Sequence, residues 1–106
     1  MPRWAAHWLW VLSISAIGST VAHSQSPPAA LERLVRQDCG SCHGMTLQGG
    51  LGPALLPANL ADKPAESLVA TIVHGRPGTP MPPWHRFLGE DEARWIVAKL
   101  MTGFPQ

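Results

Sequence analysis

Hydrophobic residues recur at intervals of three and four positions in three stretches of the chain, residues 28–38, 64–74 and 89–101. This period predicts three helices that each bury one face. No stretch alternates apolar and polar residues as a half-buried strand does, so we predict an all-α fold with three main helices and long loops. The apolar positions are Leu31, Leu34 and Val35 in the first stretch, Leu68, Val69 and Ile72 in the second, and Ala93, Ile96, Val97, Leu100 and Met101 in the third.

The two connections between these helices, residues 45–64 and 75–84, follow neither a helical nor a strand period. The first is rich in glycine and proline and is expected to be a long ordered loop. The second, GRPGTPMPPW, has proline at four of its ten positions, which predicts a stiff and extended strap. Loops of this length are uncommon in a small domain unless they wrap something. Because the apolar core is too thin for such loops, we expect an apolar group to fill the middle of the fold.

The first 24 residues have the order of segments found in a secretory signal peptide. Arg3 gives a positive start, and residues 8–18 form an uncharged apolar run. Cleavage is predicted after Ser24, with small residues before the cut, and cleavage after Ala22 is the near alternative. A membrane anchor is the competing interpretation, but the apolar run is shorter than the roughly 20 residues that span a bilayer. We therefore predict export and no stable membrane anchor.

Removal of such a signal leaves a flexible leader, residues 25–30, and one small domain, residues 31–104. The whole chain has a formal net charge of +1, and loss of Arg3 with the signal brings that charge to zero. A neutral domain with no basic patch argues against nucleic-acid binding, and we expect a monomer. A core of this size is marginal without a covalent staple or a bound group.

Both cysteines of the chain lie in one motif, CGSCH, which contains Cys39, Cys42 and His43. A disulfide between the cysteines would close a tiny loop and add little stability. A redox-active dithiol normally lies next to a βαβ pattern, and no strand is predicted here. A structural zinc site needs four ligands, mostly in pairs, and the adjacency of Cys42 and His43 strains a shared tetrahedron. The spacing C-x-x-C-H is the signature of covalent haem attachment, which we favour over the other three interpretations.

Each residue of the motif then has a role. The thiols of Cys39 and Cys42 bond to the two vinyl groups of one haem c, and His43 ligates the iron on one face. The motif must form one turn at a helix end, which is where the first predicted helix places it. A covalent haem would also supply the apolar centre and the staple that the small domain lacks.

The ligand on the other face of the iron is predicted to be Met81, because the prolines around it form a rigid strap that presents one thioether. Met45 is too close to the histidine of the motif and lies on the wrong face, and Met101 belongs to the apolar stripe of the last helix. His74 and His85 are the remaining candidates. A His/Met pair leaves no open site on the iron and raises its reduction potential, which predicts a single-electron carrier and not an enzyme.

Four further residues are predicted around the haem. A ligating histidine usually donates its other ring N–H to an acceptor such as a carbonyl, and Pro53 in GLGPAL is the candidate acceptor. The haem propionates need hydrogen-bond donors or positive charges. Arg76, Arg86 and the indole N–H of Trp84 are the candidates near the strap.

The combination of CGSCHG, GPAL, TPMPPW and the final EARWIVAKL resembles the class I c-type cytochromes over residues 31–103. This resemblance implies the class I cytochrome c fold, in which the first and last helices cross and one haem lies in an apolar cleft with an exposed edge. It also implies thioether links at Cys39 and Cys42, and iron ligation by His43 and Met81. A hydrogen bond from the histidine to the Pro53 carbonyl is implied as well.

Three longer segments, CHGMTLQGGLGPAL, IVHGRPGTPMPPW and EARWIVAKLMTGFP, are together similar to the small monohaem cytochrome found with the cytochrome cd-type nitrite reductase of denitrifying bacteria. The similarity implies a periplasmic carrier that serves nitrite reduction or maturation of the reductase's haem. The redox partners would be the reductase or its haem-maturation enzymes. Two alternatives remain: a haem-based sensor in which a ligand displaces Met81, and an electron-entry subunit of a larger reductase.

Overall fold

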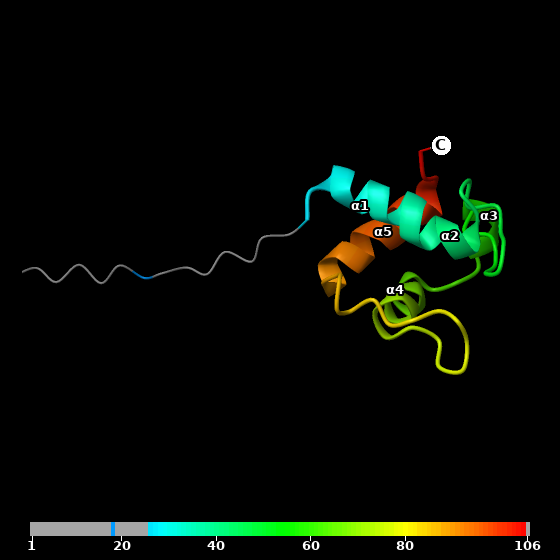
Figure 1. The fold of residues 1–106 in the computed structure, drawn as a ribbon. Helices are drawn as coiled ribbons and strands as arrows, with labels where there is room; N and C mark the ends of the chain where they lie inside the picture. The colour runs from blue at the N-terminus through cyan, green and yellow to red at the C-terminus, as the bar shows by residue number, and fades with distance from the viewer. Residues whose placement is uncertain (1–17, 19–25, 106) are drawn as a thin grey trace, which may run out of the picture.

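The computed structural model describes Gly18 and residues 26–105, and the regular structure of these residues consists of helices without a strand (Figure 1). The all-α prediction is confirmed. Apart from Gly18, the predicted signal peptide of residues 1–24 lies outside the described residues. No helix in the described part is both long enough and apolar enough to cross a bilayer. The helices are α1 (Pro28–Leu34), the π-helical turn η1 (Val35–Cys39), α2 (Gly40–His43), α3 (Pro57–Leu60), α4 (Ala65–His74) and α5 (Glu90–Thr102).

α1, η1 and α2 follow one another without a break and end at the cysteine motif. Pro28 occupies the first turn, where its missing N–H costs nothing, so the helix begins inside the stretch 25–30 that the sequence assigned to a leader. In η1 the N–H of Gly40 bonds to the carbonyl of Val35, five residues back, which inserts one extra residue into the turn before the motif. Gly44 ends the helix with a φ of 91°, a conformation that glycine adopts without strain.

The first and last helices pack against each other, and α1 runs across α5 in Figure 1. Two contacts tie their ends together. The N–H of Ser26 donates to Oε2 of Glu92 at 2.9 Å. Arg36 lies 5.9 Å from the ring centroid of Phe104 and donates to the carbonyl of Pro105. The buried core around this crossing consists of Leu31, Val35, Leu47, Leu60, Leu88, Ile96, Leu100 and Phe104.

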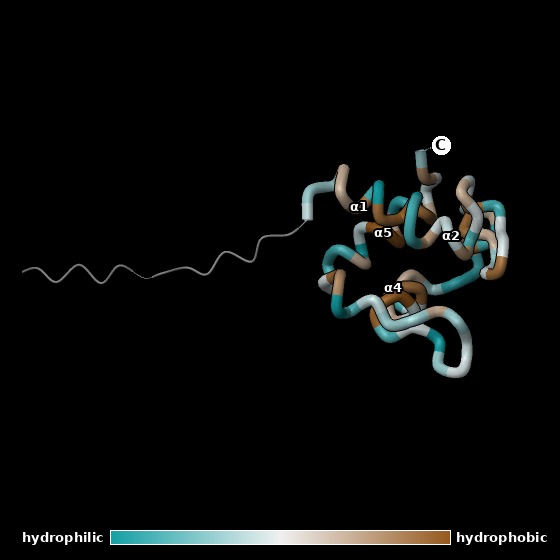
Figure 2. Tube along the Cα trace, viewed as in Figure 1, coloured by the Kyte–Doolittle hydropathy of each residue, from teal (hydrophilic) through white to brown (hydrophobic). Residues whose placement is uncertain are grey.

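A second buried cluster joins α4 to α5 and consists of Val69, Ala93 and Val97. Of the three apolar positions predicted in α4, Val69 is buried with 4% exposed, whereas Leu68 and Ile72 are half-buried. The reason is that Leu68 and Ile72 line a cavity. Figure 2 shows the hydrophobic positions concentrated in the helices, whereas the strap, residues 75–84, is pale.

The connection between α2 and α4, residues 44–64, is not the uniform loop that its sequence predicts. Its second half contains α3, which has Pro57 in its first turn and ends at Leu60. A helix of four residues is too short to show a period, so the hydrophobic pattern did not reveal it. Leu47 and Leu60 are buried and anchor the two halves of the connection in the core. The strap has neither helix nor strand, as predicted.

Candidate functional site

A cavity of about 850 Å³ lies between α2, α3, α4, α5 and the strap. Its volume falls within the roughly 300–1,000 Å³ of small-molecule and cofactor sites. The wall of the cavity is largely apolar. An apolar wall suits a large apolar cofactor better than a small polar substrate. The apolar part of the wall is formed by Leu51, Leu55, Leu60, Leu68, Ile72, Ile96, Val97 and Leu100.

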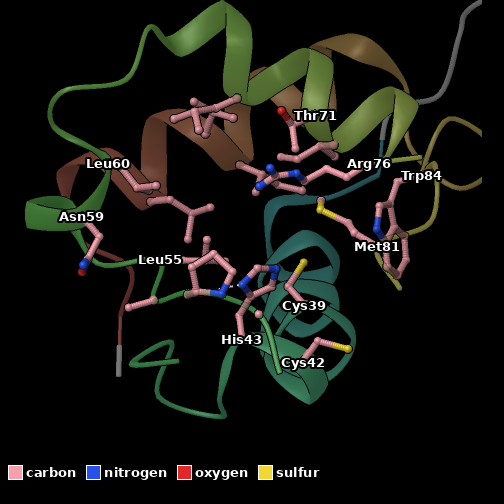
Figure 3. A pocket seen from close by; sticks show the side chains of 18 of the residues that line it. Cys39, Cys42, His43, Leu55, Asn59, Leu60, Thr71, Arg76, Met81 and Trp84 are labelled. Carbon is pink, nitrogen blue, oxygen red and sulfur yellow. Dashed lines mark hydrogen bonds between the residues drawn. The ribbon is translucent and has the colours of Figure 1, made fainter. Parts of the chain in front are cut away.

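His43 is the last residue of α2 and lines the cavity together with the two cysteines (Figure 3). Its Nδ1 lies 2.7 Å from the carbonyl oxygen of Pro53. Because a carbonyl can only accept, Nδ1 carries the proton and donates, and Nε2 keeps the lone pair that an iron ligand needs. The structure thus contains the hydrogen bond between His43 and Pro53 that the sequence resemblance implies.

The loop after α2 is hydrogen-bonded to the end of that helix, which fixes the position of Pro53. The N–H of Gly49 donates to the carbonyl of His43, and the N–H of Gly52 donates to the carbonyl of Cys42, both at 2.8 Å. A Cβ atom on Gly52 would lie 2.7 Å from Nδ1 and Cε1 of His43. The absence of a side chain at Gly52 therefore lets the loop pass this close to the imidazole.

Cys39 and Cys42 are half-buried free thiols that line the cavity from neighbouring turns of the same helix. Burial, with a smaller contribution from the negative charge of Asp38, raises the pKa of the Cys39 thiol from its usual 9.0 to about 11. Cys39 is therefore a neutral thiol at physiological pH. Among the described residues, no three His, Cys, Asp or Glu side chains gather as they would around a metal ion.

Met81 lines the cavity from the strap, and Figure 3 shows its side chain directed into the cavity. The other candidate ligands lie elsewhere. Met45 is 66% exposed, and Met101 packs against the helical core. His74 and His85 are exposed and do not contribute to the cavity wall. The fold thus brings one thioether and the imidazole of the motif to a single cavity from two separate elements.

Arg76 and Trp84 also line the cavity, whereas Arg86 lies outside its wall. Figure 3 shows the guanidinium of Arg76 inside the cavity. None of the ion pairs between described residues involves Arg76, so this cation is available to an acidic ligand group. Arg86 belongs to the turn 85–87, which follows the strap and is exposed at each of its residues.

Sequence reasoning missed several polar residues of the wall. Lys63 provides a cation in addition to Arg76, and its Nζ donates to the carbonyl of Asn59 at 3.2 Å. Ser67 and Thr71 lie one helical turn apart on α4, so the period that identified Leu68 and Ile72 could have placed them on the same side. Lys63 and Asn59 gave no such signal, because their position depends on the path of the loop. The missed set is Asp38, Asn59, Lys63, Ser67, Thr71 and Thr79.

These residues fit a covalently attached haem. Two thiols on neighbouring turns match two vinyl groups, and an imidazole and a thioether are iron ligands of c-type centres. The apolar wall matches the macrocycle. The cations of Lys63 and Arg76 match the negative charges of propionates.

Comparison with known proteins gives one family match and several close relatives. A family model described as cytochrome c oxidase, cbb3-type, subunit III matches residues 26–99. Cytochrome c55X of Pseudomonas aeruginosa is 61% identical over 75 residues, which are 71% of this chain and 63% of that protein. The chain therefore spans somewhat less than two thirds of this relative. Cytochrome c55X of Paracoccus denitrificans is 46% identical over 98 residues, 88% of this chain and 92% of that protein.

Solved structures show the same kinship. The structure titled c-type cytochrome NirC has a TM-score of 0.71 at 59% identity and covers 72% of this chain and 89% of its own. The structure titled dihydro-heme d1 dehydrogenase NirN in complex with DHE has a TM-score of 0.64 at 39% identity. It covers 71% of this chain but only 16% of its own, so the similarity concerns one part of a larger protein.

Proposed function

Because the chain belongs to the family of c-type cytochromes, we propose that it is a periplasmic carrier of single electrons with one covalently bound haem c. Cys39 and Cys42 form the thioether links, and His43 and Met81 are the axial ligands. The observation that supports this most directly is that all four of these residues line one largely apolar cavity. The proposal includes the cleaved signal of residues 1–24 and the domain of residues 31–104.

Haem c, when bound, supplies an iron that accepts and releases one electron. The chain's own residues prepare its surroundings. The hydrogen bond between Nδ1 of His43 and Pro53 fixes the orientation of the imidazole and leaves the lone pair of Nε2 available to the iron. Leucine and isoleucine side chains of α3, α4 and α5 exclude water. Lys63 and Arg76 are placed to pair with the propionates, and Trp84 supplies a further donor on the wall.

Axial ligation on both sides separates a carrier from an enzyme. With His43 and Met81 both bound, no position on the iron is open to a substrate. We therefore propose that this protein transfers electrons and does not catalyse a reaction of its own. The sensor alternative requires that a ligand displace Met81. Rapid binding of carbon monoxide to the reduced protein would favour that alternative, whereas slow or negligible binding supports the carrier.

The partner is proposed to be the cytochrome cd-type nitrite reductase or an enzyme that matures its haem. The strap HGRPGTPMPPW and the similarity to proteins named cytochrome c55X and NirC support this context. The similarity to one part of a dihydro-heme d1 dehydrogenase favours a second candidate role, as a redox module in maturation of the reductase's haem.

Anaerobic stopped-flow mixing tests the first role. The reduced, haem-loaded protein is mixed with purified cytochrome cd-type nitrite reductase, and oxidation of its haem is followed. Fast oxidation that saturates with the reductase supports electron donation. Because the domain is formally neutral once Arg3 is removed, the rate is expected to depend only weakly on salt. No oxidation by the reductase, with rapid oxidation by a small mediator, would move the role to haem maturation or to another chain of carriers.

A further inference from the structure

The strap between α4 and α5 has few hydrogen-bond donors, because four of its residues are prolines. Two of these prolines, Pro80 and Pro82, flank Met81 directly. Neither offers an N–H that could close a turn around the methionine. The conformation at Met81 therefore depends on the small number of hydrogen bonds that the remaining residues make.

A single hydroxyl lies at the centre of these bonds. The Oγ1 hydroxyl of Thr79 donates to the carbonyl of Arg76 at 2.7 Å, and the same oxygen accepts the N–H of Met81 at 3.3 Å. The carbonyl of Met81 accepts the N–H of Arg76 at 3.1 Å. Both backbone polar groups of Met81 are thus bonded within the strap, and its N–H is bonded to a side chain.

We propose that Thr79 is a positioning residue for Met81: its hydroxyl holds the backbone of the methionine so that the thioether stays directed at the iron. The inference rests on the proposed ligation of the iron by Met81. If the backbone is held, a thioether that leaves the iron returns by rotation of its side chain alone. If the backbone is free, the strap moves away and an external ligand takes the position. Thr79 thereby determines how firmly this protein behaves as a closed electron carrier.

The test measures how fast imidazole replaces Met81 in the haem-loaded ferric protein. Imidazole is kept well below saturation, so that the observed rate depends on how often the thioether returns to the iron before imidazole binds. Thr79→Val keeps the shape of the side chain and removes the hydroxyl. We expect this variant to exchange about tenfold faster, the effect of losing one hydrogen bond of ordinary strength. Thr79→Ser keeps the hydroxyl and is expected to restore the slow rate.

Thr102→Val is the matched control. Its hydroxyl also donates to a backbone carbonyl, that of Ala98 at 3.0 Å, but it lies on α5 outside the cavity wall. It is expected to leave the exchange rate unchanged. The visible spectrum of each ferric variant before imidazole is added shows whether the thioether is bound at the start. If the valine variant does not load haem, Thr79→Ala and Thr79→Ser provide the same comparison.

The outcomes separate this inference from the proposed function. Met81→Ala sets the rate for an open iron. If the unsubstituted protein binds imidazole as fast as Met81→Ala, the ligation by Met81 is wrong and the inference falls with it. If the unsubstituted protein is slow and Thr79→Val is equally slow, the ligation stands and the role of Thr79 is overturned. A serine variant as fast as the valine variant would also overturn it.

Discussion

The two sides of the cavity hold their proposed iron ligands in different ways. On one side, His43 is the last residue of a helix, and its side chain is itself hydrogen-bonded to Pro53. The loop that carries Pro53 is bonded back to the same helix. On the other side, Met81 has a side chain without a hydrogen bond, and only its backbone is held, by Thr79 and Arg76.

This difference separates two properties of the centre. The orientation of the imidazole is fixed directly, by a bond to the ring, and that bond belongs to the element that also carries the cysteines. The thioether is fixed indirectly, through the conformation of a strap that carries no part of the attachment motif. Substitutions on the helical side, which comprises α2 and the loop that carries Pro53, should therefore affect attachment of the haem. Substitutions in the strap should affect ligation by Met81 and leave attachment of the haem intact.

Substitution of the two proposed ligands should give the largest effects, and the two variants should lose different properties. His43→Ala is expected to reduce covalently bound haem by at least about tenfold, because the imidazole holds the iron between the cysteines. Met81→Ala is expected to keep the haem and to lower its reduction potential by on the order of 0.1 V, part of the roughly 0.8 V that axial ligands span. Haem staining after denaturing electrophoresis and potentiometric titration measure the two effects. Equal loss of haem from both variants would contradict the comparison.

Substitution of two glycines of the strap tests how rigid the strap is, through the free energy of unfolding. Gly75 and Gly78 both have positive φ, 67° and 80°. A Cβ on Gly75 would lie 2.6 Å from backbone atoms of Pro82 and Pro83, whereas one on Gly78 would meet nothing within 4 Å. Gly78→Ala should cost about 1 kcal/mol of unfolding free energy from backbone strain alone. Gly75→Ala should cost about 3 kcal/mol, because it adds a clash with the backbone.

Guanidinium unfolding of the haem-loaded variants measures these costs. Covalent haem content should be normal in both, because neither glycine lies near the cysteine motif. A Gly75→Ala protein as stable as Gly78→Ala would show that the strap relaxes easily. It would then be a poor support for the thioether.

Gly52→Ala disturbs the opposite side to a smaller extent. The new Cβ would stand 2.7 Å from Nδ1 and Cε1 of His43, so the ring or the loop must shift. Either shift lengthens the hydrogen bond to Pro53 and makes the imidazole a weaker base. We expect a rise in reduction potential that is smaller than the fall in Met81→Ala, with the methionine still bound. A normal potential with a normal visible spectrum would show that the loop gives way without moving the ring.

The sequence predicted the elements that repeat a pattern and the residues that carry a signature. The three long helices follow from apolar spacing, and the haem motif and the strap follow from their composition. The short helix α3 escaped because four residues show no period. The π-helical turn before the motif escaped because one extra residue in a helix leaves no compositional trace.

The polar wall of the cavity was harder to predict, because it depends on the path of the loops. Arg76 and Arg86 both lie near Met81 in sequence, yet only Arg76 lines the cavity. Arg86 lies in the exposed turn 85–87 that follows Trp84, and no local pattern in the sequence marks this turn. Lys63 lies 12 residues before the strap and 20 residues after His43, and only the fold brings it to the same wall.

The smallest effect concerns the helical side before the haem is attached. Cys42→Ser leaves Cys39 as the only thiol, and alkylation of this variant without haem reports the reactivity of Cys39. Its folded pKa of about 11 against a usual 9.0 predicts alkylation near neutral pH up to about 100-fold slower in the folded protein than in urea. Because the folded pKa is the higher one, the stability that the neutral thiol contributes is complete below about pH 9 and is lost as the pH rises towards 11.

Asp38→Asn tests the cause of this protection. Burial is the larger contribution and the charge of Asp38 the smaller, so the variant should recover only a minor part of the lost reactivity. Full recovery would assign the protection to the charge and not to the cavity wall. Slow alkylation of the folded variant would show that the cavity wall encloses Cys39 in the absence of haem.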